Sequence, residues 1–286
     1  MTNILGKVNN MSRITRNKLI LILFLISGFI LSCGTKGGDK SKNNLKTDTA
    51  KEENIATQIE SNDTSYENWI SYTYEDIIIL YPPEHVFVDN LEDMAQGFIK
   101  FRKQVCDYFK IQIPKDTINI YYYTGYGQME KFTGIDYPSV DSNIIHFSMP
   151  FNLGASMTEY VLYNWHPKEP KFNFIKQGIM TLFDFSGQDY HEMTLNFIDE
   201  KKLLSLEELA VDTTINMFHE KYQSAEAASF VAFVLEIYHL ETLEKLYLSE
   251  DPFPEAVNKI FKADVDVLQN RWLEFTEKAY YRQLNN

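Results

Sequence analysis

The sequence has few basic residues and no apolar run long enough to cross a membrane as a helix. It contains 27 Lys and Arg residues against 40 Asp and Glu residues, which gives a formal net charge of -13. Such a surface repels phosphate backbones, so we expect no nucleic-acid partner. The largely apolar run at residues 19–31 is shorter than the ~20 residues that a spanning helix needs. Because it follows a basic region at residues 11–18, it indicates the core of a signal peptide.

Cysteine is also scarce, with Cys33 and Cys106 as the two examples. Ser32 and Cys33 close the apolar run, and this junction resembles a bacterial lipoprotein signal. The resemblance implies removal of residues 1–32 and lipidation of Cys33, with palmitate among the acyl groups; the alternative is an uncleaved N-terminal anchor. Lipidated Cys33 could form no disulfide, and we expect Cys106 to be a buried, unreactive thiol.

The remaining chain divides by composition into a tether and one domain. Residues 33–65 begin with Cys33 and are poor in large apolar side chains, which predicts a flexible tether. Residues 66–286 have the length of a single domain. Removing residues 1–32, which carry four basic residues and no acidic one, changes the net charge from -13 to about -17. This acidity gives no attraction to anionic lipid, so we expect membrane attachment through the lipid on Cys33, outside the cytoplasm in the bacterial envelope.

The patterns predict an α+β domain, with a sheet and one long helix in the first half and helices in the second. Residues 69–74 and 77–81 predict a hairpin or paired strands, and 117–123 and 143–147 predict two further strands. Apolar residues at three- and four-residue spacing predict a helix over 91–108, capped by Asp89 or Asn90. Ser205 to Glu208 fits a capping box. The other helices are expected at 155–165, 172–185, 190–201, 205–211, 222–239, 241–249, 253–261 and 264–284.

Residues 158–162 occupy the place of the His-Glu-x-x-His motif of a zinc peptidase. In that motif two His residues one helical turn apart bind zinc, and the Glu polarises the bound water. Here Glu159 is kept, while Thr158 and Leu162 replace the two His residues. Downstream, Gln177 stands where a third ligand, Glu, would be expected. Leu162 has no lone pair, and a Thr hydroxyl and a Gln amide are weak zinc ligands, so we expect no metal and no cofactor.

With these positions, the chain resembles the peptidase MA-like (gluzincin) metallopeptidases as a member that has lost its zinc ligands. Residues 222–234 are similar to the helix that follows the metal site in this family, and the similarity extends over most of residues 66–286. The resemblance implies a gluzincin-like fold with a cleft between its two halves. It also makes Glu159 a catalytic relic and Tyr222 the nearest match to a transition-state-stabilising residue.

Other interpretations of these residues stay open. Glu159 could equally be one more solvated carboxylate on a helix. Ser156 follows Gly154 as in a nucleophile elbow, but Thr158 replaces the second Gly, so we expect Ser156 to cap a helix. The His residues offer no pair at three- or four-residue spacing, and they stand at positions 85, 146, 166, 191, 219 and 239.

The leading functional hypothesis is a catalytically inactive, membrane-anchored lipoprotein that binds a peptide or another envelope protein. One alternative is an active hydrolase with a site rebuilt around Glu159, and another is a structural subunit of an envelope complex. An open cleft with clustered titratable groups would favour the hydrolase. A cleft filled by side chains would argue against both the hydrolase and the peptide binder.

Overall fold

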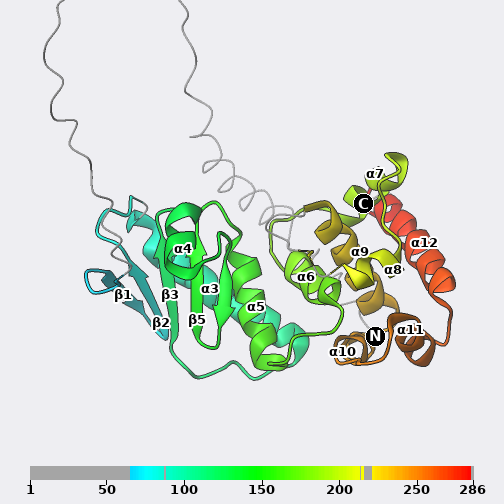
Figure 1. The fold of residues 1–286 in the computed structure, drawn as a ribbon, viewed down its shortest axis with the longest axis horizontal. Helices are drawn as coiled ribbons and strands as arrows, with labels where there is room; N and C mark the ends of the chain where they lie inside the picture. The colour runs from blue at the N-terminus through cyan, green and yellow to red at the C-terminus, as the bar shows by residue number, and fades with distance from the viewer. Residues whose placement is uncertain (1–64, 87, 213, 216–220, 285–286) are drawn as a thin grey trace, which may run out of the picture. The chain divides into compact units, whose positions relative to one another are not determined.

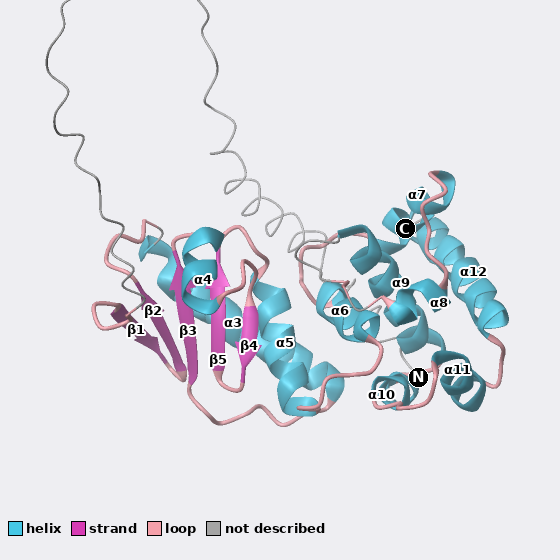
Figure 2. Cartoon of the chain, in the orientation of Figure 1, coloured by secondary structure: helices cyan, strands magenta, loops and turns pink. Residues whose placement is uncertain are grey.

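The computed structural model describes residues 65–86, 88–212, 214–215 and 221–284. These residues belong to a compact unit that spans Ser61–Asn286. Its strands precede α5 and its later part is helical, so the expected α+β class is confirmed (Figure 2). Across the described ranges, no helix is long and apolar enough to span a membrane. The expected signal peptide, Cys33 and the tether up to residue 64 lie outside the described residues.

The sheet is mixed, with a parallel centre and an antiparallel strand at each edge. The central strands β2, β3 and β5 are parallel, while β1 pairs with β2 and β4 pairs with β5 in antiparallel fashion. The predicted hairpin is confirmed, because β1 and β2 join across Glu75 and Asp76 with Tyr74 opposite Ile77. In spatial order the strands are β1 (Ile70–Tyr74), β2 (Ile77–Tyr81), β3 (Ile118–Tyr123), β5 (Ile144–Ser148) and β4 (Ser139–Asp141).

Helices cover both faces of this sheet. The helices α3 (Leu91–Phe109) and α5 (Leu153–Trp165) lie on one face, and α4 (Tyr126–Thr133) lies on the other (Figure 1). The apolar residues of α3 recur at helical spacing and are buried against the sheet, as the sequence predicted. A short 3-10 helix, Val88–Asn90, precedes α3. Asn90 takes the N-cap position of α3, although its side chain makes no capping hydrogen bond.

The second half is helical and is built around α9 (Lys221–Ile237). This helix packs against α6, α7, α10 and α12, and it contributes Phe230, Val231 and Val234 to the core. The capping box predicted at Ser205 and Glu208 is present at the start of α8. The other helices described in this half are α6 (Asn173–Leu182), α7 (Tyr190–Asp199), α8 (Leu206–Val211), α10 (Leu240–Tyr247), α11 (Phe253–Phe261) and α12 (Val265–Leu284).

Helix α5 carries the motif segment and is buried on most of its surface. Its N-cap is Asn152, whose side chain accepts hydrogen bonds from the backbone N–H groups of Gly154 and Ala155. The prediction that Ser156 caps this helix is wrong, because Ser156 lies inside the first turns and is buried. Asn was the better candidate because its carboxamide oxygen stands just before the first helical turn. With its start fixed in this way, α5 presents Glu159 toward α6.

Candidate functional site

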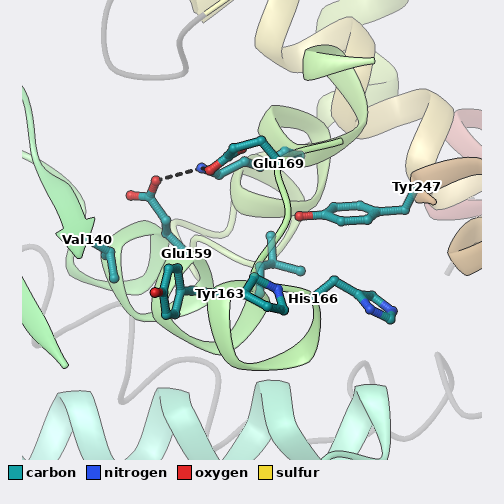
Figure 3. Close-up of a pocket in the computed structure, with 9 residues that line it drawn as sticks. Val140, Glu159, Tyr163, His166, Glu169 and Tyr247 are labelled. Carbon is teal, nitrogen blue, oxygen red and sulfur yellow. Dashed lines mark hydrogen bonds and ion pairs between the residues drawn. The ribbon is translucent and has the colours of Figure 1, made fainter. Parts of the chain in front are cut away.

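A small pocket lies where α5, α6, α10 and the edge strand β4 meet (Figure 3). Its empty volume is about 260 Å³, and this figure includes space that is open to solvent. The space enclosed between its side chains holds about one water molecule. The lining residues are Val140, Glu159, Leu162, Tyr163, His166, Pro167, Glu169, Lys176 and Tyr247.

Lys176 forms the centre of the charge arrangement in this pocket. Its Nζ atom lies 2.9 Å from Oε1 of Glu159 and 2.8 Å from Oε1 of Glu169. The side chains of Glu159 and Lys176 are only 14% and 13% exposed, whereas that of Glu169 is 70% exposed. The interpretation of Glu159 as a solvated carboxylate is therefore wrong, because the packing of α6 against α5 takes it out of water and pairs it with an ammonium group.

Burial and charge act in opposite directions on this pair. Burial raises the pKa of Glu159, and the nearby Lys176 ammonium opposes that rise. Burial lowers the pKa of Lys176, but its attraction to Glu159 and Glu169 outweighs burial and raises the pKa overall. The second oxygen of Glu159, Oε2, is buried and has no hydrogen-bond partner among the described residues. Lys176 therefore stays charged at neutral pH. Its ammonium group occupies Oε1 of Glu159, and Oε2 is buried.

Two rings complete the wall of the pocket. Tyr247 reaches in from α10, and burial raises the pKa of its hydroxyl group. Figure 3 shows the Tyr247 hydroxyl directed toward the pocket and the His166 ring directed away from Glu159. The Nε2 atom of His166 lies 3.1 Å from Oε1 of Glu244, so this histidine joins the end of α5 to α10.

The three degenerate ligand positions do not meet in the pocket. Thr158 is fully buried and its hydroxyl donates a hydrogen bond to the backbone oxygen of Phe183, at 3.0 Å. Leu162 lines the pocket, but Thr158 and Gln177 do not. The Nε2 atom of Gln177 lies 3.5 Å from Oδ1 of Asn173 on the same helix.

This set of donors does not fit the zinc ion of active gluzincins. Leu162 offers no lone pair, the Thr158 hydroxyl is engaged with a carbonyl, and the amide of Gln177 is a weak ligand. Within the described residues, no group of three or more His, Cys, Asp or Glu side chains is placed to hold a metal ion.

The remaining predicted residues lie elsewhere. Tyr222 belongs to α9, but its side chain is outside the described residues, as is the whole of Cys33. Cys106 is buried in α3, and burial raises its pKa to about 11, in agreement with an inert thiol.

Sequence reasoning missed Lys176, Glu169 and Tyr247. Lys176 stands directly before Gln177, at a position for which the zinc motif requires no particular residue, so its charge carries no weight in the motif. The one signal that could have found Lys176 is its place in the helix expected at 172–185, next to a candidate ligand position. Tyr247 gave no signal, because it reaches the pocket from a helix some eighty residues further along the chain.

Comparison with protein-family models gave no match, and comparison with curated proteins found no similar sequence. The gluzincin resemblance therefore stays a prediction that depends on the motif positions.

Proposed function

We propose that the protein is a lipid-anchored lipoprotein of the bacterial envelope whose peptidase-like domain is non-catalytic and binds an extended segment of another protein. The observation that carries the non-catalytic part of this proposal is the ammonium group of Lys176 between Glu159 and Glu169, because it pairs with the one carboxylate that the resemblance would make catalytic. The lipid on Cys33 would supply the attachment to the membrane.

The ion pair disfavours a hydrolase rebuilt around Glu159. A general base needs a lone pair within hydrogen-bond reach of a water molecule or substrate. Oε1 of Glu159 is held by Lys176, Oε2 is buried, and the enclosed space has room for about one water molecule. A peptide side chain does not fit there, so a bound peptide would have to use the surface beside the pocket.

The edge strand β4 offers such a surface. In the described part of the sheet, β4 pairs with β5 on one side and with no strand on the other. Asp141 and Ile144 flank the two-residue turn between these strands, so they form the hydrogen-bonded pair that closes it. Because hydrogen bonding alternates along an antiparallel pair, the backbone N–H and C=O of Val140 face away from β5. An extended segment could add to the sheet at this strand.

The catalytic part of the proposal is tested with internally quenched peptides of mixed sequence. We expect the full-length wild-type chain and the Glu159→Gln variant to show the same background rate. Hydrolysis by the wild type that Glu159→Gln abolishes would overturn the non-catalytic assignment and favour the rebuilt hydrolase.

The binding part is tested with a fluorescein-labelled pool of casein peptides and fluorescence polarisation. Val140→Pro removes an outward-facing donor from β4, and it should weaken binding at least tenfold. Thr73→Pro makes the matched change in β1 at the opposite edge and should leave binding unchanged. An absence of binding by the wild type, or an equal loss in both variants, would remove the β4 assignment and favour a purely structural subunit.

A further inference from the structure

The edge strand β1 lacks the features that usually protect a sheet edge. Edge strands are normally blunted by charged residues, proline or a bulge, because their free backbone groups can pair with another chain. The five residues of β1, Ile-Ser-Tyr-Thr-Tyr, include no charge, no proline and no glycine, and they pair with β2 without interruption. On the side away from β2, no strand of the described residues covers β1.

The segment before β1 crosses a face of the sheet and does not follow its edge. The hydroxyl of Tyr66 lies 2.9 Å from that of Tyr123 on β3, and the rings of Tyr66 and Phe132 of α4 are 4.9 Å apart. Trp69 packs in the same group, with its ring 5.2 Å from that of Tyr123. These contacts hold residues 66–69 on the α4 face, so this described segment does not run along the outward backbone groups of β1.

The register of the hairpin determines which groups of β1 point outward. Tyr74 and Ile77 flank the two-residue turn and form its closing hydrogen-bonded pair. Hydrogen bonding to β2 then recurs at Tyr72 and Ile70, and the backbone groups of Ser71 and Thr73 face the open edge. The side chains of Ser71 and Thr73 share one face of the sheet, whereas Ile70, Tyr72 and Tyr74 share the other.

We propose that β1 pairs with β1 of a second copy of this chain, antiparallel and two-fold symmetric about Tyr72, so that two sheets become one. In this register Ser71 lies opposite Thr73 of the second copy, and both present outward backbone groups. Ile70 lies opposite Tyr74 of the second copy, and Tyr72 lies opposite its own counterpart. The inference does not depend on the proposed function.

The side chains favour a second copy over an unrelated partner, because the strand is complementary to itself. Thr–Ser pairs, aromatic–aromatic pairs and aromatic pairs with β-branched residues are among the cross-strand pairs that stabilise antiparallel strands. The register produces only such pairs over Ile70–Tyr74. Extended by one position at each end, it sets Trp69 opposite Glu75 of the second copy, so no acid faces another acid there.

The self-pairing also suits the charge of the molecule. A chain with a formal charge of -13 repels its own copies, and two β1 strands, which carry no charged side chain, can pair without carboxylates opposite each other within the strands. Because salt screens the long-range repulsion and leaves backbone pairing intact, association should become stronger as ionic strength rises. A contact between basic and acidic patches would show the opposite dependence.

The experiment uses the full-length chain in detergent, with mass measured by sedimentation equilibrium. The wild type should associate into dimers, and more so in high salt. Ser71→Glu combined with Thr73→Glu sets like charges opposite each other and should give monomers, as should Ser71→Lys combined with Thr73→Lys. Mixing these two variants should restore dimers. A monomeric wild type, or dimers in both charged variants alone, would overturn the proposal.

Cysteine cross-linking tests the register even if the charged variants do not fold. Tyr72→Cys places thiols opposite each other across the two-fold axis, about 4.5–5.5 Å apart at Cβ, and mild oxidation should give a disulfide-linked dimer. Ser71→Cys is the matched control. In this register position 71 faces position 73 of the second copy, so the two introduced thiols are offset by two residues along the strand. The parent chain controls for Cys33 and Cys106, and Val140→Pro should not affect the cross-link. Equal cross-linking of Tyr72→Cys and Ser71→Cys would contradict the register.

Discussion

Glu159 shows how far the sequence predicts the environment of a single residue. The helix expected at 155–165 is present, and its residues Met157, Tyr160 and Val161 are buried in the core. The helical pattern could not distinguish a solvated carboxylate from a buried one, because that depends on Lys176 in another helix. Contacts between residues far apart along the chain leave no periodic signal. The motif therefore singled out Glu159 and Leu162, which line the pocket, and the fold alone supplied Lys176 as the partner of Glu159.

Glu226 is a second buried acid, and it predicts how stability depends on pH. It is 1% exposed in α9 and accepts a 3.3 Å hydrogen bond from the backbone N–H of Leu204. Burial raises its pKa from 4.5 to about 8. Between these two values the folded state keeps a proton that the unfolded state releases, so stability should fall as pH rises, by up to ~1.4 kcal/mol per pH unit.

The variant Glu226→Gln isolates this contribution, because the amide keeps an acceptor for Leu204 and does not titrate. Its free energy of unfolding in urea should exceed that of the wild type at pH 8, and the difference should shrink as pH falls toward 5. The exposed residue Glu277, changed to Gln, is the control and should leave the pH profile unaltered. A constant difference between Glu226→Gln and the wild type would contradict the buried, protonated carboxyl group.

Whole elements were easier to predict where one face carries an unbroken pattern. The helix α3 and the capping box of α8 followed from apolar spacing and from Ser205 with Glu208. The helix α4 was missed because its single buried residue is Met129 and Gly127 weakens its helical propensity. The strand β4 was missed because three residues are too few to show alternation. It nevertheless forms the sheet edge beside the pocket.

The close packing of α6 on α9 depends on the lack of a side chain at Gly178. A Cβ atom there would lie 2.5 Å from the backbone oxygen of Ala227 and 2.9 Å from Cγ2 of Val231. Gly178→Ala should therefore destabilise the domain by about 1–3 kcal/mol, the usual cost of overpacking. Gly127→Ala in α4 is the control, since no atom lies within 4 Å of its Cβ, and it should stabilise by roughly 0.5–1 kcal/mol. If Gly178→Ala and Gly127→Ala changed the free energy of unfolding in urea equally, the close approach of α9 would not explain why position 178 is glycine.

For the molecule as a whole, we propose that attachment to the membrane depends on a lipid on Cys33. Cys33→Ala should release the chain from membranes or leave an unprocessed precursor, because the acylated thiol would be the anchor. Membrane fractionation and the apparent mass of the chain measure this, with Cys106→Ala as the control that should stay attached. Normal processing and unchanged partitioning of Cys33→Ala would contradict the lipoprotein assignment.

The ion pair also joins α5, which covers the sheet, to α6 of the helical half, so it affects the stability of the whole domain. Removing one partner of a buried pair leaves an unpaired charge and typically costs about 3–5 kcal/mol, while replacing both is often close to neutral. The matched comparison is the exposed pair on α3 in which Nζ of Lys103 lies 2.8 Å from Oδ2 of Asp107. The coupling free energy between these two residues should be only about 0.3–0.5 kcal/mol.

The most direct test of the account is the double-mutant cycle of Glu159→Gln and Lys176→Met, measured as free energies of unfolding in urea. We expect each single change to be strongly destabilising and the double change to cost much less than their sum. The coupling should be several times that of Lys103 and Asp107, and no variant should differ from the wild type in peptide hydrolysis. Additive effects, together with loss of a hydrolytic activity in Glu159→Gln, would show that Glu159 serves catalysis and would contradict the account.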